Sequence, residues 1–108
     1  MDAINEYLKR TRKVTILITG EEYEDIRPRV MCKDGFEISV QANKYAYCTP
    51  RINGASEYEE VELGFPNRED KLIEDYAEEP YSLTQTVYGY VPVELVNQLV
   101  EKHGGIVN

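Results

Sequence analysis

The side chains best suited to binding chemistry are arginines and tyrosines between residues 27 and 51. Arg27 and Arg29 stand two residues apart, so both would project from one face of a strand. Arg51 follows four residues after Tyr47. Arginine forks grip phosphate through paired hydrogen bonds, and a tyrosine ring can stack on a base. The spacing predicts a ligand site for an anion or nucleotide at Arg27, Arg29, Arg51 and Tyr47. The alternative is that these arginines pair with acids of the segment 58–65.

A second candidate surface is acidic. The chain has a net charge of −8, and residues 52–108 hold twelve acidic residues against three basic ones. Alternation over 58–65 would turn Glu59, Glu60 and Glu62 mostly outward, which predicts a surface for a basic partner. The alternative is an ordinary solvated face. Such acidity argues against general nucleic-acid binding, which requires a basic surface.

No group of residues predicts catalysis. The single histidine, His103, is expected at the end of a helix, where a cation is favourable. Cys32 and Cys48 are expected as free thiols, with a disulfide as the alternative. Two cysteines and one distant histidine do not form a zinc motif, and no phosphate-binding glycine loop occurs. We therefore expect a protein that is not an enzyme and uses no metal or cofactor.

The positions of these residues depend on a fold that the sequence indicates in part. With 108 residues, the chain 1–108 is expected to form a single domain. The spacing of apolar residues predicts a helix over 3–10, and Val14–Ile18 predicts a buried strand. Asp34-Gly35 between two apolar runs predicts a hairpin with a two-residue turn, which would place Met31 opposite Ile38.

The second half alternates between strand and helix patterns. Val61, Leu63 and Phe65 are expected to point inward from one strand, and Asn67 to begin a short helix. A strand over 86–91 leads into a C-terminal helix with an apolar stripe of Val93, Val96, Leu99 and Val100. The fold expected is α+β: a mostly antiparallel sheet of four or five strands, with the C-terminal helix packed on one face and a short N-terminal helix.

Several motifs occur in a fixed order from about residue 26 to 106. They are Arg27-Pro28-Arg29-Val30, Cys32–Phe36, Ser39–Ala42, Tyr47–Arg51, Glu62–Pro66, Thr86–Val93 and Lys102–Gly105. As a set they resemble a group of small bacteriophage and prophage proteins. The resemblance implies a phage-type origin and carries over no activity or site residue. Residues 1–25 lie outside it and are read as a possible N-terminal extension.

These observations predict a non-catalytic phage-type binding protein that interferes with a host component, as in counter-defence. It would sequester a small nucleotide or block a basic host protein with its acidic face. The alternative is a small structural or assembly protein of a phage particle. No apolar run is long enough to span a membrane, and the first residues are acidic, so the host bacterial cytosol is the expected location. Nine tyrosines favour interfaces, which makes a homo-oligomer a further expectation.

Overall fold

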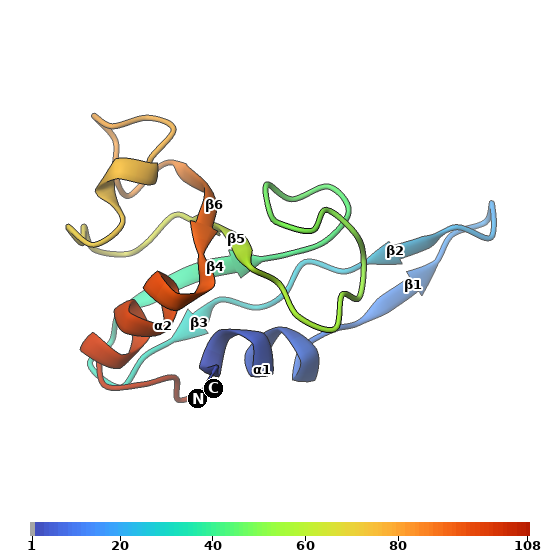
Figure 1. Cartoon of the computed structure of the whole chain (residues 1–108), viewed down its shortest axis with the longest axis horizontal. Coiled ribbons are helices and arrows are strands. Elements are labelled where there is room, and N and C mark those ends of the chain that lie inside the picture. Colours follow the sequence, from blue (N-terminus) through green and yellow to red (C-terminus); the bar gives the residue numbers. More distant parts are fainter. Residues whose placement is uncertain (1) are drawn as a thin grey trace.

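The computed structural model describes residues 2–108 and confirms the α+β class (Figure 1). Four strands form one antiparallel sheet in the order β3-β4-β5-β6, and β1 and β2 form a separate antiparallel pair. The elements are α1 (Ala3–Arg10), β1 (Val14–Ile16), β2 (Glu22–Glu24), β3 (Val30–Met31), β4 (Glu37–Gln41), β5 (Glu60–Gly64), the 3-10 helix η1 (Glu74–Tyr76), β6 (Val87–Pro92) and α2 (Val93–Lys102). Among the described residues, no helix has the length and apolarity needed to cross a bilayer.

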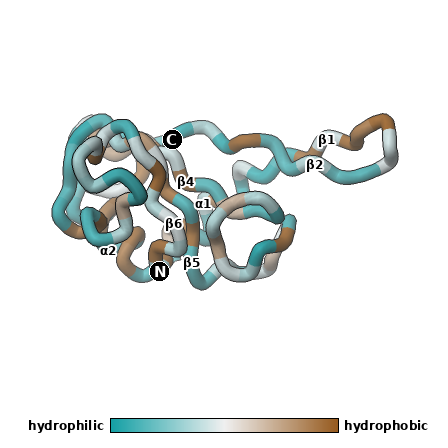
Figure 2. The backbone as a smooth tube through the Cα atoms, turned by 90° about the horizontal axis from the view of Figure 1, so that it is seen from above, coloured by the Kyte–Doolittle hydropathy of each residue, from teal (hydrophilic) through white to brown (hydrophobic). Residues whose placement is uncertain are grey.

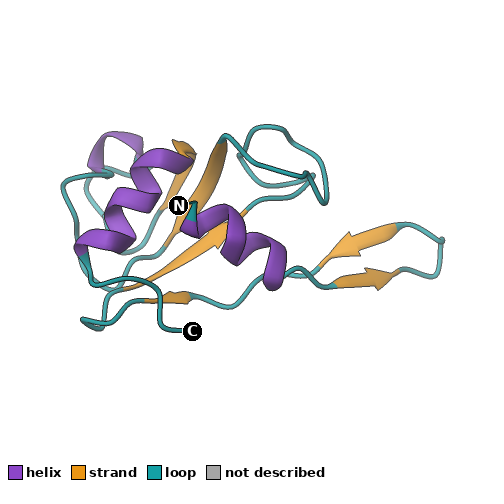
Figure 3. Cartoon of the chain, turned by 60° about the horizontal axis from the view of Figure 1, so that its bottom comes forward, coloured by secondary structure: helices purple, strands orange, loops and turns teal. Residues whose placement is uncertain are grey.

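Both helices form where the sequence predicts, and the C-terminal helix packs on the sheet as expected. They lie side by side on one face of the sheet (Figures 1 and 3). The helix α1 begins where the side chain of Asp2 accepts a hydrogen bond from the N–H of Asn5, and it buries Ile4, Tyr7 and Leu8. The predicted apolar stripe of α2 is fully in the core. The helix α1 therefore contributes three side chains to the hydrophobic core.

The predicted register of the hairpin between β3 and β4 is wrong by one residue. Val30, and not Met31, lies opposite Ile38, so Val30 is buried and Met31 is exposed. The connection is a three-residue loop, closed by a hydrogen bond from the N–H of Cys32 to the carbonyl of Phe36. Gly35 has φ +91°, the left-handed conformation that ends such loops. The extra loop residue shifts the pairing of β3 by one residue, so that Val30 turns toward the core and Met31 toward solvent.

Two predictions around residue 65 are also wrong. Val61 and Leu63 point into the core, but Phe65 is exposed and has φ 50°. No α-helix begins at Asn67, because its side chain instead bonds the N–H of Glu37 and the carbonyl of Gly35. Only the short η1 forms in this segment, and the core contact comes from the buried Ile73 just before it.

The run Val14–Ile18 is not buried, contrary to the prediction. It forms β1 and the tip of a hairpin, here called the arm (residues 13–25), which extends away from the rest of the fold (Figure 1). Figure 2 shows a hydrophobic tip and a hydrophilic returning strand. That returning strand is β2, for which no strand was predicted from the sequence. Its alternating acids concealed the strand pattern.

The base of the arm is fixed by a buried ion pair between Arg27 and Glu24. The Nη2 atom of Arg27 lies 2.7 Å from Oε1 of Glu24, and both side chains are 1% exposed. The other guanidinium N–H groups donate to the carbonyls of Leu8 in α1 and Ala42 after β4. Arg27 therefore joins the arm, the first helix and the sheet at one point.

Replacing Arg27 with methionine should lower the free energy of unfolding by about 3–5 kcal/mol, because Glu24 loses a buried partner. Urea denaturation would measure the loss. The matched control is Arg51→Met at an exposed site, where a change within about 0.5 kcal/mol is expected. Adding Glu24→Gln to the Arg27 variant should recover part of the stability. Equal effects of the two single variants would contradict this role for Arg27.

Candidate functional site

Arg27 does not belong to an exposed anion site, contrary to the prediction. Its residue is 3% exposed, and its guanidinium is occupied by Glu24, Leu8 and Ala42. The predicted alternative also differs from the structure, since the partner acid lies in β2 and not in the segment 58–65. Two-residue spacing indicated a shared face with Arg29, but an irregular segment precedes β3.

Arg29 and Arg51 lie at opposite ends of β4. Arg29 contacts Glu37, at the start of that strand, and donates to the carbonyl of Phe65 over 2.7 Å. Arg51 donates to the carbonyl of Tyr45, beyond the end of the strand, and its Cζ lies 5.5 Å from the centre of the Tyr47 ring. Of the four predicted residues, the structure therefore brings together only Arg51 and Tyr47.

The predicted acidic face is partly used inside the fold. The Oε1 atom of Glu60 accepts a hydrogen bond from the hydroxyl of Thr49, and that of Glu62 accepts one from the N–H of Tyr47. Both residues are half-buried, and only Glu59 of the predicted set is exposed. Glu60 and Glu62 therefore hold the 47–49 segment against β5. Charge reversal there would disturb this loop.

The arm presents an open strand edge. The N–H groups of Leu17 and Asp25 bond the carbonyls of Glu21 and Lys13 across the hairpin. Bonded and non-bonded pairs alternate in antiparallel strands, so Val14 and Ile16 turn their backbone N–H and C=O groups outward. Their side chains are exposed, Ile16 to 62%. The outer edge of β1 therefore combines free backbone groups with apolar side chains.

The edges of the main sheet are covered by the chain itself. Beside β3, residue Ile106 forms a bridge with Cys32, and the N–H of Val107 donates to the carbonyl of Met31. Beside β6, Ala77 forms a bridge with Tyr88. Covering edges in this way prevents unwanted strand pairing. The arm differs from the main sheet in this respect.

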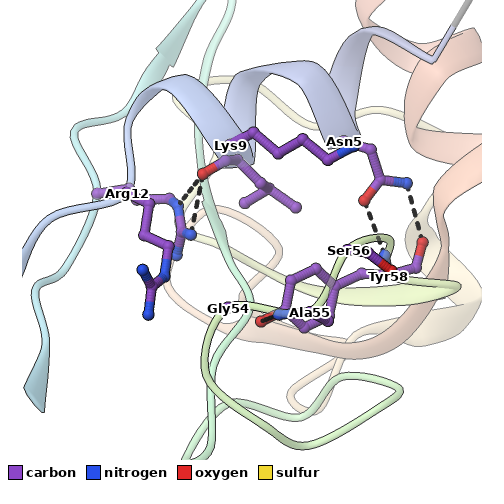
Figure 4. A pocket seen from close by; sticks show the side chains of 9 residues that line it. Asn5, Lys9, Arg12, Gly54, Ala55, Ser56 and Tyr58 are labelled. Carbon is purple, nitrogen blue, oxygen red and sulfur yellow. Dashed lines mark hydrogen bonds between the residues drawn. The ribbon is translucent and has the colours of Figure 1, made fainter. Parts of the chain in front are cut away.

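A pocket of about 190 Å³ lies between α1 and the segment 54–58 (Figure 4). Figure 4 shows the helix above the pocket and Arg12 at one end of it. Apolar parts of Leu8, Ala55 and Tyr58 form much of its wall. The volume is below the roughly 300–1,000 Å³ of pockets that enclose drug-sized ligands. It would admit a small molecule or the head of a larger one.

The lining of this pocket carries an excess of positive charge. Lys9, Arg12 and Arg27 line it, and the buried carboxylate of Glu24 compensates one of the three charges. Arg12 is held at its Nε atom, 3.2 Å from Oε2 of Glu24, and lies against Gly54, where a Cβ atom would approach Cζ of Arg12 to 2.9 Å. Among residues 2–108, the terminal amino groups of Arg12 and the ammonium of Lys9 have no hydrogen-bond partner. They remain available to an anion.

His103 occupies the end of α2 as predicted, but it is held on both sides by carboxylates. Its Nδ1 lies 2.7 Å from Asp34 and its Nε2 lies 2.8 Å from Asp70, while its ring stacks on Phe36. Both ring nitrogens are therefore occupied by carboxylate oxygens. Neither nitrogen is free to act as a base.

The two carboxylates are stabilised in their charged forms. The hydrogen bond from His103, followed by that from the N–H of Phe36, lowers the pKa of Asp34. For Asp70, burial acts to raise the pKa, but hydrogen bonds from Leu72, His103 and Lys102 outweigh it, and the pKa is lowered. This cluster joins α2, the β3–β4 loop and the segment before η1.

The cysteines are free and buried, as predicted for reduced thiols. Burial is the main cause of the raised pKa of both Cys32 and Cys48. Both thiols are therefore poor nucleophiles. Within residues 2–108, no group of three or more His, Cys, Asp or Glu side chains has a geometry that could hold a metal ion.

Comparison of the chain with protein-family models, with curated proteins and with solved structures found no match.

Neither the open edge of the arm nor the basic pocket was predicted from the sequence. The β-branched run at Val14–Ile18 indicated a strand correctly but gave no sign of its exposure. The signal for a hairpin was Gly20, with φ +84°, between two short strands. The pocket had no sequence signal, because Lys9 and Arg12 meet Ser56 and Gly54 only in the folded chain.

Asp70→Asn should destabilise the protein at pH 7 and change its response to acid. Because the native pKa values of Asp34 and Asp70 lie below the unfolded value of about 3.9, their stabilising effect is present above about pH 4 and is lost as the pH falls through the native values. The difference in melting temperature between wild type and Asp70→Asn should therefore narrow below about pH 4. Asp75→Asn, at an exposed carboxylate, is the control. A constant difference from pH 7 to 2 would contradict this account.

Proposed function

We propose that this chain is a non-catalytic assembly protein that joins another protein chain through the arm. The observation that carries the proposal is the open edge of β1, where outward backbone groups and the apolar side chains of Val14 and Ile16 lie together. Strand addition to such an edge supplies main-chain hydrogen bonds, and alternate side chains supply specificity. The partner is therefore a protein that offers a strand edge bordered by apolar side chains.

The contrast between the arm and the main sheet supports this function. Residues of the chain cover both edges of the main sheet, whereas the arm stands clear of the body. Ile18 at the tip is fully exposed, in a chain with 30% charged residues. An unprotected apolar edge promotes aggregation unless a partner covers it. In the phage setting that the resemblance implies, the arm would connect subunits of a particle.

The reactive groups also support a role without catalysis. His103 is held between two carboxylates, and Cys32 and Cys48 are buried with raised pKa values. These groups serve the fold. We therefore favour the assembly alternative over interference with a host component through an exposed arginine site.

A second candidate function is the binding of a small anion, and the pocket beside α1 favours it. Lys9 and Arg12 supply unpaired N–H groups at its rim, and Leu8 and Tyr58 supply an apolar wall. This combination suits a small phosphate monoester or carboxylate. The pocket would replace the predicted site at Arg27, Arg29, Arg51 and Tyr47 as the place where an anion binds.

The arm proposal predicts that a photo-cross-linking residue at Ile18 captures one defined protein in cells that naturally produce the chain. The same residue at Tyr81, which is equally exposed on another loop, is the matched control. Mass spectrometry would identify the adducts. Because both side chains point into solvent, neither change should affect folding. A similar mixture of weak adducts at both positions would contradict docking through the arm.

The pocket proposal predicts that inorganic phosphate or a phosphate monoester binds and that Lys9→Ala weakens binding about tenfold or more, since one charged hydrogen bond is lost. Isothermal calorimetry at low salt would measure the change. Arg10→Ala is the control, because it removes the same charge one position along α1 from a side chain that bonds the carbonyl of Asn108 instead. Equal weakening by both variants would indicate nonspecific attraction and exclude a defined site.

A further inference from the structure

We propose that the partner of the arm is a second copy of this chain, paired edge to edge through β1. This inference rests on the proposed function and identifies its partner. In the paired form, the two β1 strands run antiparallel about a two-fold axis at Thr15. The result is one four-stranded sheet in the order β2-β1-β1-β2, shared by two copies.

The backbone pattern of β1 is self-complementary about that axis. Val14 and Ile16 turn their N–H and C=O groups away from β2. In an antiparallel pair, such residues of one strand form hydrogen-bonded pairs with the equivalent residues of the other strand. Placing Thr15 on the axis sets Val14 of one copy opposite Ile16 of the other, twice. About four backbone hydrogen bonds would form within the three residues already in strand conformation. No change of fold is needed.

The side chains along this edge suit contact between identical copies. Val14, Thr15 and Ile16 carry no charge, so two chains of net charge −8 can meet there without placing like charges opposite each other. Val14 and Ile16 of both copies would share one face of the joined sheet, in apolar contact. An isologous contact of this kind closes as a dimer.

Charge at the two ends of the arm favours the antiparallel arrangement. The base of β1 carries Arg12 and Lys13, whereas the strand that returns from the tip begins with Glu21 and Glu22. Pairing about Thr15 brings the base of one arm beside the tip of the other. Lys13 of one copy then lies opposite the uncharged Leu17 of the other, and Glu21 follows one strand further across the sheet, so opposite charges come near each other at both ends. A parallel arrangement would bring like ends together.

Disulfide trapping tests the geometry directly. Residues on the axis form a non-bonded pair with Cα atoms about 4.5 Å apart, within the roughly 4.4–6.8 Å that a disulfide spans. Thr15→Cys should therefore give a covalent dimer on mild oxidation. Tyr23→Cys is the matched control, because Tyr23 lies opposite Thr15 on the outer strand of the arm. Because its own Cys32 and Cys48 are buried, the wild-type protein should form no covalent dimer and serves as the negative control.

Register and association give two further readouts. A mixture of Val14→Cys and Ile16→Cys should cross-link more than either variant alone, and light scattering should show a mass that doubles from 12.5 kDa with rising concentration. Ile16→Lys should restore the monomer. A monomer at all concentrations, with Thr15→Cys linking no faster than Tyr23→Cys, would overturn the second copy as partner. If Ile18 still captured one different protein, docking through the arm would stand while pairing between copies fell.

Discussion

The buried ion pair of Arg27 and Glu24 is the interaction on which the shape of this protein depends. A buried guanidinium is tolerated only when its N–H groups are bonded, and here they reach α1, the segment after β4 and the arm. Glu24 in turn accepts hydrogen bonds from Arg12 and from the backbone N–H of Gly54. Four separate parts of the chain thus meet at one pair of charges. The pair fixes where the arm begins and how it is oriented.

This constraint explains how an exposed arm can still have a defined position. Apart from Glu24, the residues of the arm make little hydrophobic contact with the core. The orientation of β1 and β2 is therefore set by the contacts at the base of the arm. There, Arg27 also forms two hydrogen bonds with the side chain of Gln41 through its backbone N–H and carbonyl. The base is held in place by buried polar contacts, and the edge of β1 is open because no other part of residues 2–108 pairs with it. A docking element needs both properties.

The sequence was most informative where one local rule decided the structure. The spacing of apolar residues predicted both helices. The sequence was least informative where the structure depends on strand register or on which strands are buried. Asp34-Gly35 correctly indicated a hairpin, but the choice between two and three loop residues depends on contacts such as that between Asp34 and His103. Val14–Ile18 has the composition of a core strand, and only tertiary structure places it outside.

The charge pattern shows the same limit and leads to a different view of the surface. Residues 9–51 hold nine basic and six acidic residues, a local excess of positive charge in the sequence. In the folded chain Arg12, Arg27, Arg29 and Lys44 form ion pairs with acids of the arm or of β4. Much of the basic charge therefore acts within the fold, and acidic side chains dominate the remaining surface. On such a surface a second copy meets repulsion almost everywhere, and the uncharged edge of β1 is where contact costs least.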